Sequence, residues 1–232
     1  MRYFYDLHLH SALSPCGDED MTPNNIVNMA LLKGLDIIAL SDHNSAGNLR
    51  AVAKAAGSRL LVIPAIEVES AEEVHIVCYF PSVDRAEQFS EELKAQLPPI
   101  ENRPDIFGRQ LYLNEKDEVT GEEHQLLVCA SGLSIEQVFS LTANYGGASV
   151  PAHIDRSSSS ILSNLGFIPP DLPVSALEIT AKGRAELEQK YAGFRILTNS
   201  DAHYLEDIAE PEFSLDLEEK SIDCFLHYLW GK

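Results

Sequence analysis

Short hydrophobic runs that end at a histidine or an acidic residue recur along this chain of 232 residues. They constrain its fold more than any other feature does. The runs alternate with helical patterns, which is typical of parallel strands joined by crossover helices. In a barrel built from such units, the side chains that follow the strands meet at one end. The pattern therefore predicts an α/β barrel with a polar site at the carboxyl ends of its strands.

The first run ends in His8-Leu9-His10. Residues two apart on a strand point to the same side, so we expect both imidazoles to project together. Two converging imidazoles make half of a metal site. The same pair also arises by chance, so its role depends on what the later strands carry.

The pattern repeats at the later predicted strands, which cover residues 35–40, 60–66, 74–80, 148–152, 176–179 and 195–197. Six of the eight histidines lie beside a strand end, and only His124 and His227 do not. Buried imidazoles and carboxylates need partners, and one metal ion can serve several of them. The candidate ligands beside the later strands are Asp42, His43, Glu67, His75, His153, Asp201 and His203.

The link between the third and fourth runs breaks the simple alternation. Only about seven residues separate Glu67 from the run that begins at Val74. A parallel crossover needs about a dozen residues or more, so we expect a hairpin here. In a hairpin the end of one strand lies beside the start of the next. The sequence therefore predicts that Glu67 and His75 lie at the same edge of the sheet.

The ligand types favour particular metals. Imidazole and carboxylate without a cysteine pair suit Zn, Mn or Fe rather than a structural cysteine-based zinc site. The candidate ligands are too many for one ion, which predicts two or three divalent ions with Glu67 as the bridging carboxylate. Such clusters produce hydroxide at neutral pH and neutralise both oxygens of a displacement at phosphorus. Arg156, three residues after His153, either holds a phosphate bidentately or forms a surface ion pair.

The motifs occur in the order His8-x-His10, Ser41-Asp42-His43-Asn44, Glu67, Val74-His75-Ile76-Val77, His153 and Asn199-Ser200-Asp201-Ala202-His203. This order resembles the PHP (polymerase and histidinol phosphatase) family. The resemblance implies a distorted seven-stranded (β/α)7 barrel of the TIM type that carries a trinuclear metal site. It also implies metal-dependent hydrolysis of phosphoesters.

The resemblance further implies how the ligands divide among the ions. The implied sets are His8, His10, Glu67 and Asp201 for one ion, Glu67, His75 and His153 for a second, and His43, His203 and one loop residue for the third. Attack by metal-bound hydroxide needs no separate Ser or Cys nucleophile. The catalytic residues are then Glu67, Asp201 and His203, the last two as candidates for assisting proton transfer to the leaving oxygen.

The loop residue of the third set has three candidates. Family members commonly place an Asp or His five residues before the proline that starts the first helix, which here is Asp18 before Pro23. Asp20 is the competitor, and Cys16 comes third. The loop departs from the commoner Ser-Asp-Gly form, because it reads Ser-Pro-Cys-Gly-Asp over residues 14–18.

Residues 1–232 are expected to form a single PHP domain. Residues 98–132 are less regular than the rest, and we interpret them as an insertion or lid. Asp42 precedes a candidate ligand and is expected to orient it. Glu178, at the end of a short predicted strand, is expected to have a structural or supporting role.

The net charge of −19 bears on partners. General binding of nucleic acid needs a basic face, which is not evident in the sequence, so we expect a small phosphorylated substrate and no long duplex nucleic acid. No stretch is long and apolar enough to span a bilayer, and no export signal is evident. Four widely spaced cysteines indicate reduced thiols. A cytoplasmic protein without a membrane partner is expected, and the sequence does not give its oligomeric state.

The leading hypothesis for function is hydrolysis of a small phosphate monoester, or of a nucleotide or short oligonucleotide phosphate, by metal-bound hydroxide. One alternative is a 5'-3' exonuclease that acts on short oligonucleotides. Another is a non-catalytic metal-binding or regulatory domain, although the near-complete ligand set argues against it.

Overall fold

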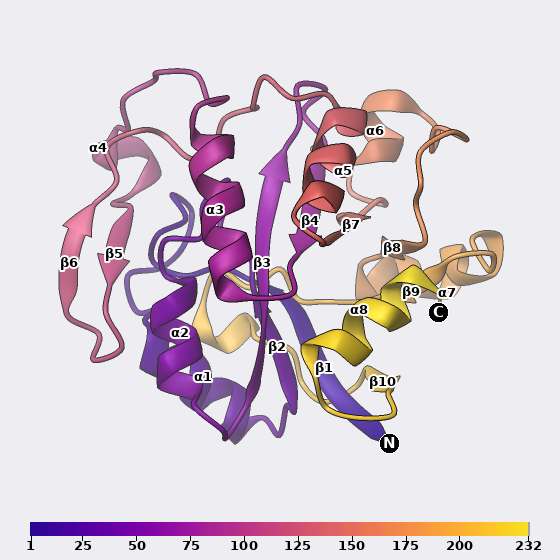
Figure 1. The fold of residues 1–232 in the computed structure, drawn as a ribbon, viewed down its shortest axis with the longest axis horizontal. Coiled ribbons are helices and arrows are strands. Elements are labelled where there is room, and N and C mark those ends of the chain that lie inside the picture. Colours follow the sequence, from indigo (N-terminus) through magenta and orange to yellow (C-terminus); the bar gives the residue numbers. More distant parts are fainter. Residues whose placement is uncertain (232) are drawn as a thin grey trace.

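A curled six-stranded sheet forms the centre of the computed structural model, which describes residues 1–231 (Figure 1). The sheet order is β10-β1-β2-β3-β4-β7. Strands β1 to β3 are mutually parallel, whereas β4 is antiparallel to both β3 and β7. The strands are β1 (Arg2–Leu9), β2 (Ile37–Leu40), β3 (Leu61–Glu69), β4 (His75–Tyr79), β7 (Ala148–Pro151) and β10 (Ser214–Asp216).

Two further strands, β8 (Ala176–Glu178) and β9 (Arg195–Leu197), form a separate parallel pair. Single contacts link this pair to the main sheet: the Ile154 N–H donates to the Glu178 carbonyl, and Leu9 forms an isolated bridge with Ala202. The α/β fold curled towards a barrel is therefore confirmed. Among residues 1–231, however, the sheet has six strands rather than a closed ring of seven. Strands of three residues are too short to form full ladders on both sides.

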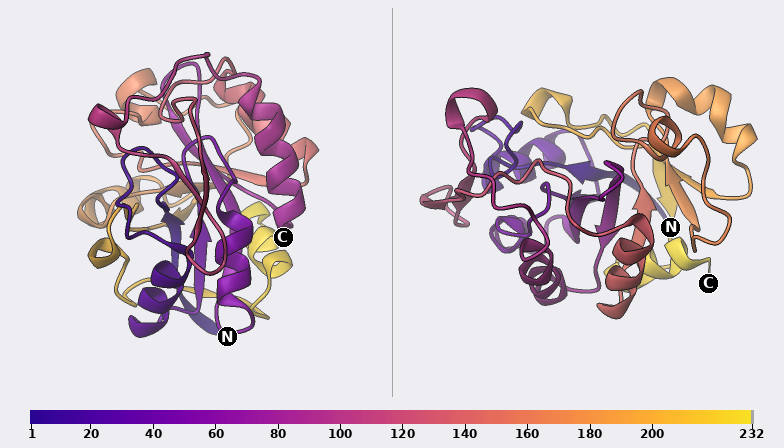
Figure 2. Two further views of the ribbon diagram at one scale, coloured as in Figure 1. Left: turned by 90° about the vertical axis from the view of Figure 1, so that its left-hand side faces the viewer. Right: turned by 90° about the horizontal axis from the view of Figure 1, so that it is seen from above.

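Helices pack around the sheet and connect its strands (Figures 1 and 2). The longer ones are α1 (Pro23–Leu32), α2 (Leu49–Ala56), α3 (Val83–Lys94), α5 (Ile135–Asn144), α7 (Ala181–Lys190) and α8 (Ile222–Trp230). The shorter ones are α4 (Pro104–Phe107), α6 (Ile161–Leu165) and the 3₁₀ helix η1 (Leu205–Asp207). No helix within residues 1–231 has the length and apolar character needed to cross a membrane.

Local sequence signals fix where the main helices begin. The Thr22 hydroxyl accepts the Asn25 N–H at the start of α1, and Pro23 occupies the first turn. Ser134 and Gln137 form a reciprocal capping box at the start of α5. These caps fix the starts of the two helices and the loops that precede them.

Two hydrophobic clusters lie on the two faces of the curled sheet. The inner cluster includes Tyr5 and Leu7 of β1 and is closed by Phe225 of α8. The outer cluster includes Leu9 of β1 together with side chains of α1, α2 and α3. Leu7 and Leu9 are two residues apart and yet belong to opposite clusters, so the alternation of β1 is broken between them.

A one-residue bulge in β1 explains this break. Between Asp6 and Leu9 strand β1 advances three residues, while β2 advances only two, from Ile38 to Leu40. Bulges re-aim side chains and are common next to active sites. Here the bulge turns Leu9 outward, so that His8 and His10 face the interior of the barrel at its carboxyl end.

The segment 98–132 contains α4 and the hairpin of β5 (Leu111–Leu113) and β6 (Val119–Glu122). It lies at one end of the molecule, and α7 lies at the opposite end (Figures 1 and 2). The buried Asn48 side chain ties the hairpin to the barrel: it donates to the Leu111 carbonyl at 2.9 Å and accepts the Leu113 N–H at 2.8 Å. The Leu111 N–H also donates to the Ala12 carbonyl at 2.8 Å. The hairpin is therefore attached directly to the loop that follows His10.

Gly147 offers a test of how tightly β7 packs against β4. A Cβ at this position would lie 2.4 Å from the Tyr79 carbonyl oxygen of β4 and 2.8 Å from Thr142 Cγ2. We expect Gly147→Ala to lower the free energy of unfolding by about 2 kcal/mol or more, because the backbone of β4 or β7 must shift. Urea denaturation measures the change. The control is Gly193→Ala, whose Cβ would meet no atom within 4 Å. Equal losses from both substitutions would contradict this account of the β4–β7 contact.

Candidate metal centre

Five imidazole nitrogens surround the carboxylate of Glu67 at 2.9–3.5 Å. They belong to His8, His10, His43, His75 and His153. Glu67 lies near the carboxyl end of β3 and is 1% exposed, so this is an anion held in the protein interior. The antiparallel turn from β3 to β4 brings His75 beside it, with Nδ1 2.9 Å from Oε1. The expected hairpin is confirmed.

Asp201 is the second carboxylate of the cluster. Its Oδ1 lies 3.0 Å from His10 Nε2 and 3.3 Å from His8 Nε2. The backbone of Asp201 has φ = 54°, a left-handed conformation that is uncommon for a residue other than glycine. Strain of this kind often marks a functional position, and here the unusual backbone accompanies a carboxylate that faces the histidines.

Several polar atoms of the cluster are buried without a hydrogen-bond partner. They are His8 Nε2, both carboxylate oxygens of Glu67 and both ring nitrogens of His153. An unsatisfied buried polar atom costs free energy, and nearly all such atoms in folded proteins find partners. These atoms converge on one region and are of the types that ligate divalent cations. The residues present therefore fit a metal centre.

Three groups of side chains have ligand atoms within 4.8 Å of one another. One group contains the same four residues that the PHP resemblance assigns to one ion. The second group contains Glu67 and His75, as the second implied set does, but has His43 in place of His153. The third group contains His43 and His203, as the third implied set does, and has His10 in place of a loop residue. The three groups are His8, His10, Glu67 and Asp201; His43, Glu67 and His75; and His10, His43 and His203.

The charges in the cluster depend on one another. Burial opposes ionisation of Glu67, but the imidazoles of His75, His8 and His43 outweigh it and hold the pKa of this carboxyl well below its usual range. Burial also opposes protonation of His8, yet Glu178, Asp201 and Glu67 raise its pKa well above the usual value. Metal binding must displace any proton that a ligand nitrogen of this cluster carries.

Residues outside the cluster fix the orientation of its histidines. Glu178, at the end of β8, contacts His8 Nδ1 at 3.1 Å and accepts hydrogen bonds from the His153 N–H and Asn199 Nδ2. Asp42 acts at the other side: it accepts the Ser14 hydroxyl at 2.8 Å, and Ser14 Oγ lies 2.9 Å from His10 Nδ1. Sequence analysis named both carboxylates, but Ser14 and Asn199 gave no signal apart from their closeness to ligands.

The loop candidates lie at different places. Asp18 is not part of the cluster: its Oδ1 accepts the Asp20 N–H at 2.9 Å within the loop itself, and Asp20 is exposed. Cys16, the third loop candidate, belongs to none of the three ligand groups either. Burial of its sulfur favours the neutral thiol, but contacts with His203 and His43 prevail and lower the pKa of Cys16 to about 6.

Arg156 forms an ion pair with the Asp201 carboxylate, and its side chain is 43% exposed. The expectation of an ion pair has a counterpart, and the binding of phosphate by Arg156 stays a prediction. The guanidinium is engaged in an ion pair, and that ion pair is with a member of the metal cluster rather than with a remote surface group. His203, with a side chain 20% exposed, is another partly accessible group on this side of the cluster.

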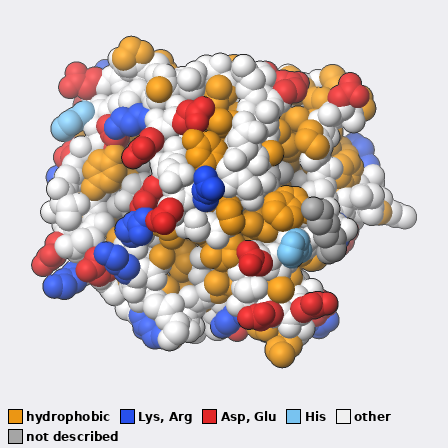
Figure 3. Space-filling view, in the orientation of Figure 1, with side chains coloured by type: hydrophobic (Ala, Val, Ile, Leu, Met, Phe, Trp, Pro, Cys, Tyr) orange, Lys and Arg blue, Asp and Glu red, His pale blue; other side chains and the backbone are white. Residues whose placement is uncertain are grey.

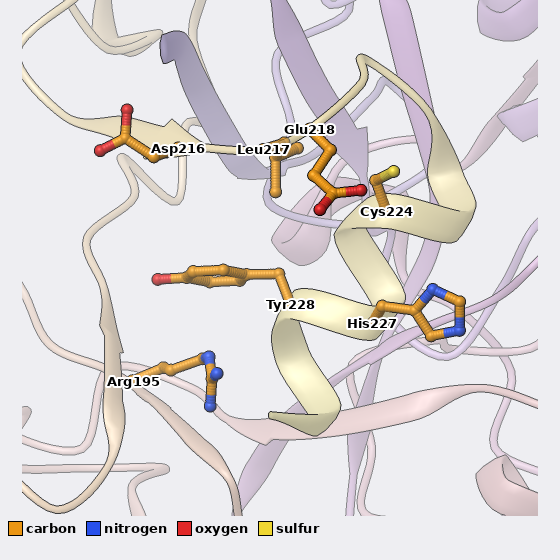
Figure 4. Close-up of a pocket in the computed structure, with 7 residues that line it drawn as sticks. All are labelled: Arg195, Asp216, Leu217, Glu218, Cys224, His227 and Tyr228. Carbon is orange, nitrogen blue, oxygen red and sulfur yellow. The ribbon is translucent and has the colours of Figure 1, made fainter. Parts of the chain in front are cut away.

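A separate pocket of about 400 Å³ lies against α8 and contains none of the candidate ligands (Figure 4). The guanidinium of Arg195 stacks over the ring of Tyr228 there, 5.0 Å from the ring centroid. His227 lines this pocket, and His124 is exposed elsewhere. The two histidines that sequence analysis set apart from the site therefore lie away from it.

Comparison with known proteins identifies proteins of similar sequence and similar structure. No known protein-family model matches the chain. An uncharacterised protein of Methanocaldococcus jannaschii is 32% identical over 103 residues, which are 44% of this chain and 13% of that protein.

Endonuclease Q of Pyrococcus furiosus, a lesion-specific endonuclease, superposes on the whole chain with a TM-score of 0.75 and 18% identity, and this chain spans 56% of its length. A Bifidobacterium adolescentis protein, provisionally described as a metal-dependent phosphoesterase, gives a TM-score of 0.60 at 17% identity, with 97% and 94% of the two chains covered.

The chain shares its fold with endonuclease Q and with the protein provisionally described as a metal-dependent phosphoesterase. The resemblance to the PHP family is confirmed at this level. An amidohydrolase of Chromobacterium violaceum shares the fold as well, with a TM-score of 0.60, 20% identity, and coverage of 97% of this chain and 96% of that one.

The expectation that long duplex nucleic acid is excluded is wrong. Endonuclease Q, which shares the fold, has been crystallised with a 27-mer duplex substrate that carries an abasic lesion at its active site. The inference used the net charge, which is a sum over the molecule, whereas binding depends on the local potential. On the face seen in Figure 3, Lys and Arg side chains are interspersed with Asp and Glu. Metal ions in the cluster would add positive charge where a phosphate must bind.

The central place of Glu67 leads to a prediction about metal content. Glu67→Gln keeps the shape of the side chain and removes its charge. Because Glu67 belongs to two of the three ligand groups, we expect the variant to lose more than one ion per chain. Mass spectrometry of metals in purified protein measures the count. The control is His124→Ala, an exposed histidine away from the cluster, which should leave the count unchanged. A full complement of ions in Glu67→Gln would contradict the bridging position.

The contacts of Glu178 lead to a second prediction. Glu178→Gln removes the charge that orients His8 without removing any ligand. We expect metal affinity to fall about 10- to 100-fold, the usual cost of losing an orienting partner. Competition with a chelator of known affinity measures this change. Unaltered affinity would mean that the packing of β1 alone orients His8.

Proposed function

We propose that this chain is a metal-dependent phosphoester hydrolase. The observation that carries the proposal is the carboxylate of Glu67, whose two buried oxygens have no hydrogen-bond partner and are surrounded by five imidazoles. A cluster that served only to stabilise the fold would have its polar atoms paired. The shared fold of a protein described as a metal-dependent phosphoesterase supports the same reaction class.

The residues divide into roles by their positions. Glu67, Asp201 and the histidines hold two or three ions of Zn, Mn or Fe, which suit imidazole and carboxylate ligands. When bound, such ions lower the pKa of a coordinated water and neutralise charge on phosphoryl oxygens. Glu178 and Asp42 keep the imidazoles oriented. The ring of His203 contacts the Asp201 carbonyl oxygen through Nδ1 at 2.8 Å, which leaves Nε2 to bind metal or to donate a proton to the leaving oxygen.

Arg156 is proposed to bind the substrate phosphate. Its guanidinium reaches the cluster through Asp201, and its side chain is partly accessible. If the Asp201 carboxylate coordinates a metal ion, its ion pair with Arg156 weakens. The N–H groups of Arg156 can then donate to a phosphoryl oxygen, a partner that matches the guanidinium geometry. The proposed substrate is a small phosphate monoester, or a nucleotide or short oligonucleotide phosphate.

A second candidate is incision of nucleic acid. The observation that favours it is the superposition of the whole chain on endonuclease Q. Because the chain spans about half of that protein, the rest of endonuclease Q has no counterpart in these residues.

We also propose that residues 1–232 act as one domain with 98–132 as an insertion. The contacts of Asn48 and Ala12 with the β5–β6 hairpin support this organisation.

The reaction class has a direct test. Metal-free protein is loaded with Zn, Mn or Fe and given a panel of sugar and nucleoside monophosphates, short 5'-phosphorylated oligonucleotides, and duplex DNA with an abasic site. We expect release of phosphate or cleavage that stops when a chelator is added. Product analysis separates the two candidates. No turnover of any phosphoester by fully loaded protein would overturn the proposal in favour of a binding or regulatory role.

The role of Arg156 predicts a specific change in kinetics. Arg156→Ala removes a charged hydrogen bond to phosphate, which is worth about 1.5–3 kcal/mol, so we expect kcat/KM to fall about 10- to 100-fold, mostly through KM. The matched control is Arg59→Ala, an exposed arginine that donates to the Ala55 carbonyl at the end of α2. If metal content falls in Arg156→Ala, the ion pair with Asp201 is the main role of this residue.

A further inference from the structure

Glu69 is a charged side chain beside the candidate metal centre that has no ligand role. It lies two residues beyond Glu67 on β3, so both side chains point to the interior side of the strand, about 7 Å apart along it. Val68, between them, faces the outer hydrophobic cluster. Glu69 belongs to none of the three ligand groups found within residues 1–231. Its carboxylate therefore lies one step beyond the metal cluster, towards the open carboxyl end of the barrel.

The backbone of Glu69 is held on both sides. Its N–H donates to Asn44 Oδ1 at 3.1 Å, and its carbonyl accepts the N–H and the hydroxyl of Ser131 at 2.9 and 2.8 Å. Asn44 in turn donates to the carbonyls of Leu127 and Cys129 at 2.8 and 3.0 Å. These contacts fix the end of β3, and with it the point from which the Glu69 side chain extends.

The carboxylate of Glu69, unlike its backbone, has no hydrogen-bond partner among residues 1–231. His75, the residue opposite Glu69 in the β3–β4 register, directs Nδ1 at Glu67 and has Nε2 3.9 Å from Glu69 Oε2, which is beyond hydrogen-bond distance. The Glu69 side chain is 14% exposed, so a ligand at the mouth of the site can reach it. Its oxygens therefore have accepting capacity that the protein itself does not fill.

Opposite charges lie on the two sides of His75. Glu69 ends β3 on one side of β4, and Arg156 follows β7, the strand on the other side. The loop that carries Arg156 returns across the start of β4, where the Ser159 carbonyl accepts the His75 N–H at 3.0 Å. A phosphoryl group is attracted by Arg156 and by metal ions in the cluster, whereas Glu69 repels it. A bound ester would therefore direct its phosphate towards Arg156 and its alcohol part towards Glu69.

We propose that Glu69 selects the alcohol part of the substrate: it accepts a hydrogen bond from a hydroxyl or ammonium group there, and it excludes an alcohol that carries a second anion. Hydrogen bonds to a charged acceptor are stronger than those to a neutral one, most of all when the donor is charged as well. A second anion in the same place is repelled, because water screens charges only weakly around a side chain that is mostly buried. This inference rests on the proposed function and specifies its substrate class: monoesters whose alcohol bears a hydrogen-bond donor, in preference to bisphosphates and phosphorylated acids.

Binding of phosphonates to the Zn-loaded protein tests this role without turnover, because a carbon–phosphorus bond is not an ester. Alkylphosphonates of similar length that end in an ammonium, a hydroxyl, a methyl or a carboxylate group are titrated by calorimetry. We expect affinity to fall in that order, with a factor of about ten or more between the ammonium and the methyl compounds. Glu69→Gln keeps the shape of the side chain and removes its charge. In this variant we expect the ammonium compound to lose about tenfold in affinity and the carboxylate compound to bind more tightly.

Glu73→Gln is the matched control, because Glu73 is an exposed carboxylate in the turn between β3 and β4. It should leave the order of affinities as it is in the unaltered protein. An unchanged order in Glu69→Gln, or the same change in both variants, would overturn the proposal. Loss of metal from Glu69→Gln, measured by mass spectrometry, would overturn it as well, because Glu69 would then serve to position His75.

The binding series and the turnover of phosphoesters can fail separately. Selective binding that depends on Glu69, without hydrolysis of any phosphoester, would contradict only the proposed reaction. Hydrolysis together with an affinity order that does not respond to Glu69→Gln would contradict only the role of Glu69.

Discussion

A carboxylate buried without hydrogen bonds, at Glu67, is the constraint on which the rest of this structure depends. Taking one anion out of water into a protein interior costs several kcal/mol, and the cost is offset only by opposite charge at close range. The chain meets this need with five imidazoles at 2.9–3.5 Å. The carboxylates raise the pKa of two of them, His8 and His43, whereas burial and the neighbouring His203 and His43 lower the pKa of His10. An arrangement stabilised by protons in this way is also one that divalent cations can take over, because the same atoms are ligands once the protons leave.

The topology explains how one side chain can face so many others. Parallel strands bring His43 and Glu67 to one edge of the sheet, but a purely parallel barrel would place only strand ends there. The antiparallel β4 adds a strand start, so that His75 stands directly beside Glu67. The bulge in β1 has a similar effect. Leu7 faces inward, so strict alternation would turn His8 and His10 outward, but the bulge turns both of them inward. Both irregularities increase the number of ligands that converge on one point.

Much of the site follows from sequence, because ligand type and position beside a strand are both readable. The predicted strand 148–152 ends within one residue of β7, and the predicted strand 60–66 begins within one residue of β3. The loop ligand was harder to predict. Spacing from Pro23 favours Asp18, but spacing cannot show the path of the loop, in which Gly17 packs on the Ser11 carbonyl. The short strands β8 and β9 match the predicted runs 176–179 and 195–197, but β10 has no predicted counterpart, because its three residues form a strand only by pairing with β1. For the same reason the number of strands in the ring could not be obtained from hydrophobic runs.

The charge of the chain shows why composition bears less on function than local geometry does. With −19 overall, the molecule repels polyanions at long range, yet salt at physiological concentration screens such repulsion beyond about 8 Å. At the site itself, the balance is set by the ions and by Arg156, whose distance to a bound phosphate would be far shorter than the screening length. An acidic surface with a cationic centre slows encounter with a nucleic acid without forbidding its binding. In the proposed function, selectivity between a small phosphoester and a polynucleotide would therefore depend on the shape of the rim around Arg156 and His203.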